Sequence, residues 1–301
     1  MQQGRGETCN GSGFMYEINV THRIGSGGNG EILKGLLGKD KTECVVKRVS
    51  GNSKASYMQL MNEGRVLKYL CDAGFVDAPC YFCEKDGALV MGFVPGRTIG
   101  AMDIRQMSEK ELRSLFVDIT SLIVRLHGLN PPVIHRDIKP SNIMIDDRGR
   151  LYLIDFGTAE ILDDFSVENK RKGKSLPAGT KSYAAPEQYG GLGSESYQVD
   201  IYQLGKTMER LLGKAIVSKR FAGEMKGIVD RCCMPSCAER YLSAYDIRKD
   251  LMSISVRKNN FPIKIFNKKF MGKFHYKDGK CKENNEVFID IVRTYDTIEF
   301  L

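Results

Sequence analysis

The sequence predicts an α+β fold in which a small β-rich lobe precedes a larger helical lobe and a small β-rich appendage ends the chain. Short apolar runs with strand-like composition fill most of residues 14–94. Apolar residues at helical spacing dominate residues 95–255. After residue 256 short alternating runs return between turn signals, so we expect a basic appendage over residues 256–301.

The composition is that of a folded globular protein. The chain has 301 residues, of which 42% are apolar and 27% charged, with a net charge of +8. These values exclude a fully disordered chain. The nine cysteines are scattered and no apolar leader is recognisable, so we expect reduced thiols and a cytoplasmic protein. No apolar run approaches the roughly 18–20 residues of a membrane span, and this modest charge does not indicate a nucleic-acid partner.

The first lobe is predicted to begin after a flexible lead-in at residues 1–13. The expected strands cover residues 16–24, 31–37, 42–49 and 88–94. A helix at about residues 54–72 interrupts them. Gly64 lies inside this helix and lowers its intrinsic propensity by ~1 kcal/mol, so we expect the helix to be mobile.

A glycine-rich segment, IGSGGNGEI at residues 24–32, joins the first two strands. Its place between two strands excludes a dinucleotide fingerprint, and the lack of Gly-Lys-Ser/Thr excludes a Walker loop. Backbone amides of such a hairpin can approach a triphosphate because side chains are missing. From this segment alone, a plain flexible hairpin is the alternative.

Lys47 ends the apolar strand segment CVVK, and Glu63 follows 16 residues later on the expected helix. An ammonium group at this position needs an anionic partner. A Lys–Glu pair would hold the lysine against phosphates. The alternative is a surface lysine whose stem lies along an edge strand.

The second lobe is predicted to begin with a long helix. Ser108 and Glu111 have the spacing of a capping box. The apolar residues behind them recur at helical spacing and predict one buried face: Leu112, Leu115, Phe116, Ile119, Leu122, Ile123 and Leu126. We expect short strands over residues 133–157, irregular structure over 158–195 and helices over 196–255.

Three motifs of this lobe occur in a fixed order. They are HRDIKPSN at residues 135–142, Asp155-Phe156-Gly157 and Ala185-Pro186-Glu187. Together with the glycine-rich segment and Lys47, this order resembles the protein kinase superfamily over about residues 16–255. The chain looks most similar to bacterial Ser/Thr kinases of the eukaryotic-like type. The resemblance implies a bilobal protein-kinase-like fold that transfers the γ-phosphate of ATP to Ser or Thr.

The resemblance also implies catalytic roles. Asp137 is expected to accept or orient the proton of the acceptor hydroxyl, and Lys139 to neutralise the γ-phosphate. Thr180 in a GT…APE pattern is expected to bind both of them, which favours Ser/Thr specificity.

The resemblance assigns the metal and the phosphates to four residues. Asn142 and Asp155 are expected to hold Mg²⁺, or Mn²⁺ in its place, through oxygen atoms. Lys47 is expected to grip the α- and β-phosphates, held there by Glu63.

The remaining residues implied to bind ATP lie on the first lobe, the linker and one strand of the second lobe. They are Ile24, Gly25, Ser26, Gly27, Gly28, Asn29, Gly30, Ile32, Val45, Met91, Phe93, Val94 and Met144. Met91 is the expected gatekeeper. The next residue, usually acidic in this family, is Gly92, so one adenine contact is expected from backbone alone.

Several other positions are expected to be structural or regulatory. The resemblance implies that Asp200 pins the catalytic-loop backbone and that Glu187 forms a buried ion pair with Arg240. Ser175 is the expected autophosphorylation site, where a phosphate would meet Arg136. The alternative is a loop that is ordered without phosphate, or one that is modified at Ser166, Thr180 or Ser182. The basic run at residues 170–174 is either a solvated loop or a counter-charge for that phosphate.

Two groups of cysteines have the spacing of metal ligands. Cys80 and Cys83 are expected in the first lobe, and Cys232, Cys233 and Cys237 in the second. Zinc needs four ligands in one place. We therefore expect structural cysteines.

The leading function is an active protein Ser/Thr kinase, with a protein substrate and self-association for autophosphorylation. The alternatives are a small-molecule kinase with a kinase-like fold and a pseudokinase scaffold. The GT…APE pattern argues against the first alternative. The presence of Lys47, Asp137, Asn142 and Asp155 argues against the second. The basic tail is expected to be separable from catalysis.

Overall fold

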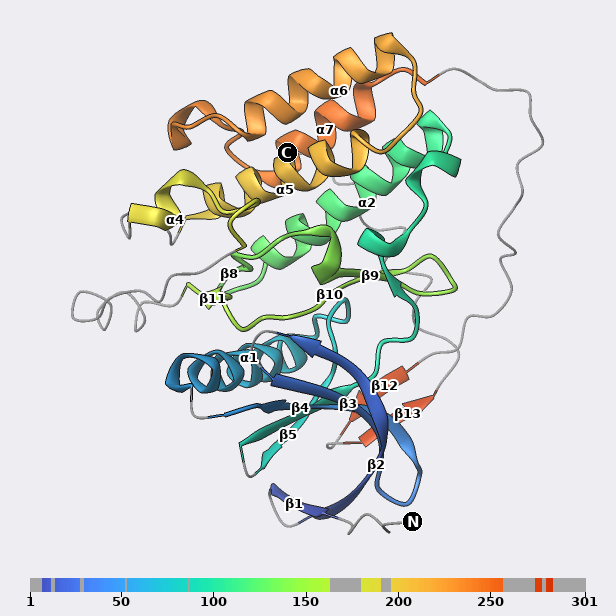
Figure 1. Cartoon of the computed structure of the whole chain (residues 1–301), viewed down its shortest axis with the longest axis vertical. Coiled ribbons are helices and arrows are strands. Elements are labelled where there is room, and N and C mark those ends of the chain that lie inside the picture. The colour runs from blue at the N-terminus through green and yellow to red at the C-terminus, as the bar shows by residue number, and fades with distance from the viewer. Residues whose placement is uncertain are drawn as a thin grey trace, which may run out of the picture. The chain divides into compact units, whose positions relative to one another are not determined.

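The structure is a computed structural model of the chain, which divides into two compact units, residues 1–258 and 259–301. It describes residues 7–11, 14–27, 30–51, 53–85, 87–162, 180–190, 196–256, 274–277 and 280–283. Within the first unit, an antiparallel sheet with one long helix forms the N-lobe, and helices dominate the C-lobe (Figure 1). The predicted two-lobe fold class is confirmed.

The N-lobe sheet has six strands in the order β1-β2-β3-β4-β6-β5. The strands are β1 (Glu7–Gly11), β2 (Phe14–Gly27), β3 (Gly30–Leu37), β4 (Thr42–Val49), β5 (Tyr81–Lys85) and β6 (Ala88–Gly92). Side chains alternate between the two faces of a strand. On β4, Cys44 and Val46 are therefore buried in one small core, while Val45 and Lys47 lie on the opposite face.

Strand β1 was not predicted. Residues 1–13 were expected to form a flexible lead-in, but Glu7–Gly11 pairs with Phe14–Ile18 of β2 in antiparallel register. The segment is polar and rich in glycine, so it carries no apolar alternation. Backbone pairing with β2 adds it to the sheet without needing that alternation.

Helix α1 (Lys54–Asp72) has the predicted bounds, and Ser53 caps its first turn by accepting from the Ser56 amide. Gly64 is buried on the face toward β5. A Cβ atom at Gly64 would lie 1.9 Å from the Glu84 carboxylate of β5. The glycine that weakens the helix therefore allows α1 and the Glu84 side chain to lie close together.

The C-lobe begins with short 3₁₀ turns and the long helix α2 (Glu109–His127). Its predicted capping box is confirmed: the Glu111 amide donates to Ser108, and the Ser108 amide donates to the Glu111 carboxylate at 2.8 Å. The predicted apolar residues of its inner face are all buried. The other C-lobe helices are α4 (Pro186–Gly190), α5 (Tyr197–Leu212), α6 (Lys219–Cys232) and α7 (Ala244–Ser253).

Small sheets between the lobes position the motifs. One sheet joins β7 (Arg97–Thr98), β9 (Ile143–Ile145) and β10 (Leu151–Leu153), and another joins β8 (Val133–Ile134) and β11 (Glu160–Ile161). The remaining 3₁₀ turns are η1 (Ile99–Ala101), η2 (Ile104–Gln106), η3 (Pro140–Asn142) and η4 (Cys237–Glu239). The HRDIKPSN motif thus lies between β8 and β9, and residues 155–157 follow β10. The stretch expected to be irregular contains β11 and α4.

The second unit contains an antiparallel hairpin of β12 (Phe274–Lys277) and β13 (Lys280–Glu283). Lys277 pairs with Lys280, on either side of the Asp278-Gly279 turn signal. In the first unit, Ser175 and the basic run at residues 170–174 lie outside the described residues. Among the helices that are described, none is both long enough and apolar enough to cross a membrane.

Candidate active site

Asp137 lies at the centre of a cluster of four side chains. One of its carboxylate oxygens accepts from the Thr180 hydroxyl at 3.0 Å and from the Thr180 amide at 3.1 Å. The other accepts from Lys139 Nζ at 2.6 Å and from Asn142 Nδ2 at 2.9 Å. Lys139 also donates to the Thr180 hydroxyl at 2.6 Å. Four donors therefore fix the position of the carboxylate, and the expected contacts of Thr180 with Asp137 and Lys139 are present.

The backbone of this loop is held from α5. Asp200 is fully buried, and its carboxylate accepts from the amides of His135 and Arg136, both at 2.8 Å. Arg136 has a positive φ of 65°, a conformation that costs a residue with a side chain of order 1–3 kcal/mol. The two hydrogen bonds offset that cost, which confirms the expected pinning by Asp200.

Gln203 and Gln188 complete this support, and the sequence analysis missed both. Gln203 accepts from the Ile138 amide and donates to the Arg136 carbonyl, each at 2.7 Å. It also donates to Gln188 of α4 at 3.0 Å, and Gln188 donates to the Arg136 carbonyl at 3.1 Å. A fully hydrogen-bonded buried network of this kind makes the loop rigid.

The Asp155-Phe156-Gly157 turn is held from α1. Asp155 has a φ of 65°. The Phe156 ring is buried against the His135 ring, with centroids 4.8 Å apart. Asn62 donates its side-chain amide to three carbonyls, those of Phe156, Gly157 and Ala159, at 3.4, 3.1 and 2.9 Å. Asn62 was also missed, because nothing in the sequence links it to a segment about 95 residues away.

Lys47 joins the two lobes. Its ammonium donates to the Glu63 carboxylate at 2.5 Å and to Asp155 Oδ1 at 2.9 Å. Burial on its own lowers the pKa of Lys47, but the charges of Glu63 and Asp155 outweigh it and raise the pKa above its ordinary value. For the Asp155 carboxyl, burial acts in the opposite direction and on its own raises the pKa. The charge and hydrogen bond of Lys47 nevertheless hold the pKa of Asp155 below its usual range. The expected Lys47–Glu63 pair is present and Lys47 is protonated.

Asn142 and Asp155 fit the oxygen chemistry of a hard divalent cation. The Asn142 carbonyl accepts from the Ile154 amide at 3.0 Å, so the two residues are tied through backbone. The Asn142 side-chain nitrogen is engaged with Asp137, so its side-chain oxygen is the atom that could hold a cation. Mg²⁺ and Mn²⁺ both prefer such carboxylate and amide oxygens.

The apolar residues expected around adenine are half-buried or exposed. Ile32, Val45 and Met144 are half-buried, and Ile24 is 43% exposed. Gly25 lies beside Ile32 on the paired strand. Ser26 and Gly27 end β2, and Gly28 and Asn29 lie outside the described residues.

Gly30 is required by a close backbone approach. A Cβ atom there would lie 1.8 Å from the Arg48 carbonyl oxygen of β4. Glycine therefore lets the start of β3 pair tightly with β4, one residue from Lys47. Glycine at position 30 is therefore explained by strand packing, in addition to any contact of its backbone with a phosphate.

The end of β6 and the segment that follows it contain the remaining predicted nucleotide residues, Met91, Phe93 and Val94. Met91 and Val94 are buried. The Phe93 amide donates to the Glu43 carbonyl at 3.3 Å, and its ring lies 3.8 Å from the Lys34 ammonium. The amide and the ring of Phe93 are therefore both engaged within the N-lobe.

Arg136 forms an ion pair that the sequence analysis did not predict. Its guanidinium donates to the Glu160 carboxylate of β11 at 3.1 Å, and both residues are buried. Ser175, the expected source of a phosphate for Arg136, lies outside the described residues. An acidic side chain therefore already compensates the charge of Arg136.

The predicted Glu187–Arg240 pair is confirmed. Two parallel hydrogen bonds of 2.7 and 2.9 Å join the guanidinium to the carboxylate. Arg240 also donates to the carbonyls of Met234, Gln198 and Pro235. This pair, in which Arg240 is buried and Glu187 half-buried, ties α4 to the segment before α7.

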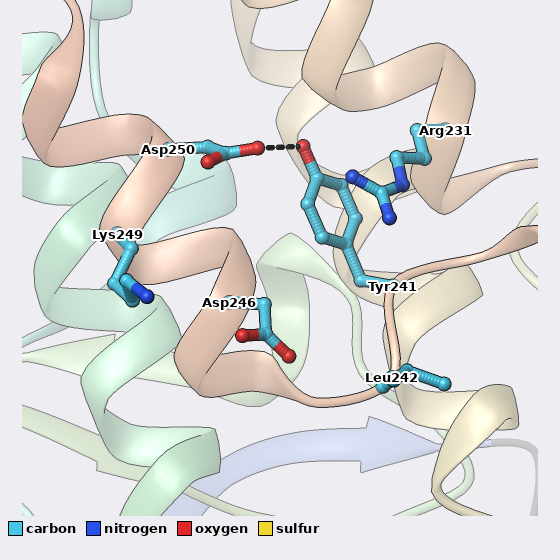
Figure 2. Close-up of a pocket in the computed structure, with 6 residues that line it drawn as sticks. All are labelled: Arg231, Tyr241, Leu242, Asp246, Lys249 and Asp250. Carbon is cyan, nitrogen blue, oxygen red and sulfur yellow. Dashed lines mark hydrogen bonds between the residues drawn. The ribbon is translucent and has the colours of Figure 1, made fainter.

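A small pocket with a volume of about 260 Å³ lies in the C-lobe beside α6 and α7. Figure 2 shows its lining side chains, among them Tyr241, whose hydroxyl donates to Asp250 at 2.7 Å. The Arg231 guanidinium lies 4.2 Å from the Tyr241 ring. The pocket contains none of the predicted site residues.

Comparison with known proteins gives the family. The protein kinase domain family matches residues 18–258. An LRR receptor-like serine/threonine-protein kinase, EFR, of Arabidopsis thaliana is 31% identical over 69% of this chain and 22% of its own length. A probable L-type lectin-domain containing receptor kinase, V.3, of the same plant is 33% identical over 66% of this chain and 31% of its own length.

The chain thus spans less than a third of the length of these two relatives. Both are plant receptor kinases, so they give no support to the predicted bacterial subtype. The family match covers the C-lobe, the N-lobe from residue 18 onward and every predicted site residue. The chain belongs to the protein kinase family.

Proposed function

We propose that this protein transfers the γ-phosphate of ATP to serine and threonine hydroxyls of proteins, including its own activation segment. The observation that carries this proposal is the cluster of Asp137, Lys139 and Thr180, in which one hydroxyl bonds both charged groups. The names of the relatives given above, which include a serine/threonine-protein kinase, support the same specificity.

The chemistry follows from where the charges lie. Asp137 orients the acceptor hydroxyl and receives its proton, because its carboxylate is fixed by four donors. Lys139 balances the charge of the transferred group. Lys47, positioned by Glu63, holds the α- and β-phosphates.

A divalent cation bound here would neutralise the charge that develops on the phosphates during transfer. Asn142 and Asp155 would hold it. Ile24, Ile32, Val45 and Met144 would enclose the adenine. The backbone of Gly25–Gly30 would cover the phosphates, and the Met91–Val94 linker would offer its backbone to the base.

Seven cysteines of the described residues are thiols rather than disulfides, which supports a reducing, cytoplasmic location for the catalytic domain. Autophosphorylation would bring two copies of the chain together. The preferred protein substrate is a further property of the whole protein.

The test is an assay with ATP radiolabelled at its γ-phosphate, using the purified full chain and a generic basic protein. We expect label on both proteins, recovered as phosphoserine and phosphothreonine, and none with Asp137→Asn. Label only on small molecules would support the small-molecule kinase alternative. Nucleotide binding without any transfer would support the pseudokinase alternative.

A further inference from the structure

Cys71 and Cys80 form a pair of adjacent thiols outside the catalytic cluster. Cys71 lies in the last turn of α1, and Cys80 directly precedes β5. Their sulfurs lie 3.5 Å apart and share a hydrogen bond. Neither cysteine is part of a disulfide, and both are half-buried. The sequence spacing had grouped Cys80 with Cys83, but Cys83 is buried in the small core of the sheet.

The surroundings of Cys71 favour its thiolate. The Tyr81 amide donates to the Cys71 sulfur at 3.0 Å. The hydrogen bond with Cys80, together with that from Tyr81, lowers the pKa of Cys71 to about 7, although burial and the charge of Asp72 act in the opposite direction. The thiolate is the reactive form of cysteine, so Cys71 is the nucleophile of the pair.

A metal site does not explain the pair. Within the described parts of the chain, no three His, Cys, Asp or Glu side chains gather so that they could hold a metal ion. Two sulfurs alone fall short of the four ligands that structural zinc requires. A pair of facing thiols with one activated sulfur instead suits oxidation.

We propose that Cys71 and Cys80 form a peroxide-sensitive disulfide site. The Cys71 thiolate attacks hydrogen peroxide, the O–O bond breaks, and the released hydroxide takes a proton to become water. The other oxygen stays on Cys71 as a sulfenic acid. The Cys80 sulfur then attacks the Cys71 sulfur, and the sulfenic oxygen leaves as a second water with the Cys80 proton. The thiols lose two electrons, which the peroxide gains.

Forming the disulfide requires only a small movement of the two sulfur atoms. A disulfide has an S–S distance of about 2.05 Å, so the sulfurs must approach by about 1.5 Å. The two residues are only nine positions apart in sequence and already face each other. The product is therefore a local link between α1 and the segment that leads into β5.

The link would join two parts of the proposed nucleotide site. Cys71 lies on the same helix as Glu63, which holds Lys47. The Cys80 carbonyl accepts from the Gly92 amide at 2.7 Å. A Cβ atom at Gly92 would lie 3.3 Å from the Cys80 nitrogen. Glycine in place of the usual acidic residue thus allows the linker to pack against Cys80, and oxidation would restrain α1 relative to the linker.

The experiment treats the reduced full chain with hydrogen peroxide and maps its peptides without reduction. We expect a cross-linked peptide that contains Cys71 and Cys80, with the loss of two hydrogen atoms. Cys71→Ser should abolish it. Cys80→Ser should leave a sulfenic acid on Cys71 that a 1,3-diketone reagent traps. Cys83→Ser is the matched control and should retain the cross-link.

Hydrogen exchange supplies a readout that does not depend on kinase activity. Oxidation should slow exchange in the last turn of α1 and at Gly92 in the wild type, and a dithiol reductant should reverse the change. Cys71→Ser should show no such change. A cross-link through Cys83, over-oxidation of Cys71 without a cross-link, or unchanged exchange in the oxidised wild type would overturn the proposal. The wild-type peptide map decides the site even where a serine variant does not fold.

Discussion

The two halves of the active site are held in place by different means. In the C-lobe, Asp200 and Gln203 of one helix fix the backbone around Asp137 through buried hydrogen bonds. In the N-lobe, Lys47 is fixed by two charges on separate elements, Glu63 on α1 and Asp155 after β10. The position of the catalytic carboxylate is thus a property of the C-lobe core, whereas the position of the lysine depends on α1.

Helix α1 has a double role in this difference. Glu63 holds Lys47, and the adjacent Asn62 holds the turn that contains Asp155. Neighbouring residues on one helix therefore fix the phosphate-binding lysine and the metal-binding turn together. A shift of α1 would disturb both, while the hydrogen bonds around Asp137 would remain.

The largest expected effect comes from removing the charges that meet where the lobes join. Lys47→Met and Asp155→Asn should each lower kcat about a hundredfold to a thousandfold, because each removes a charge aimed at the nucleotide or its metal. Phosphate transfer from radiolabelled ATP measures it. Lys68→Met is the matched control on α1, since Lys68 is 62% exposed and pairs only with the exposed Asp72 among the described contacts. Unchanged turnover in either site variant would contradict the assigned roles.

The next effect concerns stability rather than chemistry and tests the C-lobe alone. Arg240→Met should destabilise the protein by about 3–5 kcal/mol, because it leaves Glu187 and several carbonyls without their partner. Denaturant unfolding measures the loss. Lys226→Met, which removes an exposed pair on α6, should change stability by less than about 1 kcal/mol. Equal losses of unfolding free energy in Arg240→Met and Lys226→Met would show that the Glu187–Arg240 pair stabilises the protein no more than an exposed pair does.

The same pair predicts a pH dependence. Burial alone would raise the pKa of Glu187, but the hydrogen bonds and charge of Arg240 hold it below its ordinary value. A carboxylate with a lowered folded pKa stabilises the protein above its unfolded pKa and loses this contribution as pH falls through the folded pKa. The stability difference between wild type and Glu187→Gln should therefore shrink at acidic pH. A difference that grows on acidification would contradict the ion pair.

A smaller effect tests the link through α1. Asn62→Ala removes three hydrogen bonds to the Asp155–Ala159 segment and should lower kcat about tenfold, with Lys47 and its partners intact. Steady-state kinetics checks this, and the melting temperature monitors the fold. Arg65→Ala is the control, because Arg65 is exposed and reaches the turn only by way of Asn62. Wild-type kcat in Asn62→Ala would show that the turn is held without α1.

The contrast between the lobes also explains what the sequence could predict. Lys47, Asp137, Asn142 and Asp155 were found because phosphoryl transfer demands fixed residue types in a fixed order. The same motifs placed Thr180 and Asp200, whose contacts are as expected. These predictions need no knowledge of the surrounding packing.

The residues that were missed act through contacts that are distant in sequence or depend on packing. Gln203 reaches the catalytic loop across 67 residues, and Asn62 reaches the turn across about 95. Cys71 meets Cys80 only because α1 packs beside β5. Strand β1 lacks any apolar alternation. Polar residues of this kind fit many roles, so their partners appear only once the chain is folded.

The smallest expected effect concerns the activation segment and asks how far the C-lobe is complete without phosphate. The Ser175 side chain remains the predicted autophosphorylation site, and its phosphate would bond Arg136. Because Glu160 already pairs with Arg136, Ser175→Ala should remove one phosphate from the intact mass yet lower kcat by less than about tenfold.

Glu160→Gln removes the internal anion that pairs with Arg136. In the Glu160→Gln background, Ser175→Ala should therefore lower kcat by a larger factor than it does alone. Kinetics of the four proteins gives the coupling between the two sites. Independent effects of the two substitutions would show that carboxylate and phosphate do not share Arg136, and a wild-type phosphate count in Ser175→Ala would place the modification elsewhere.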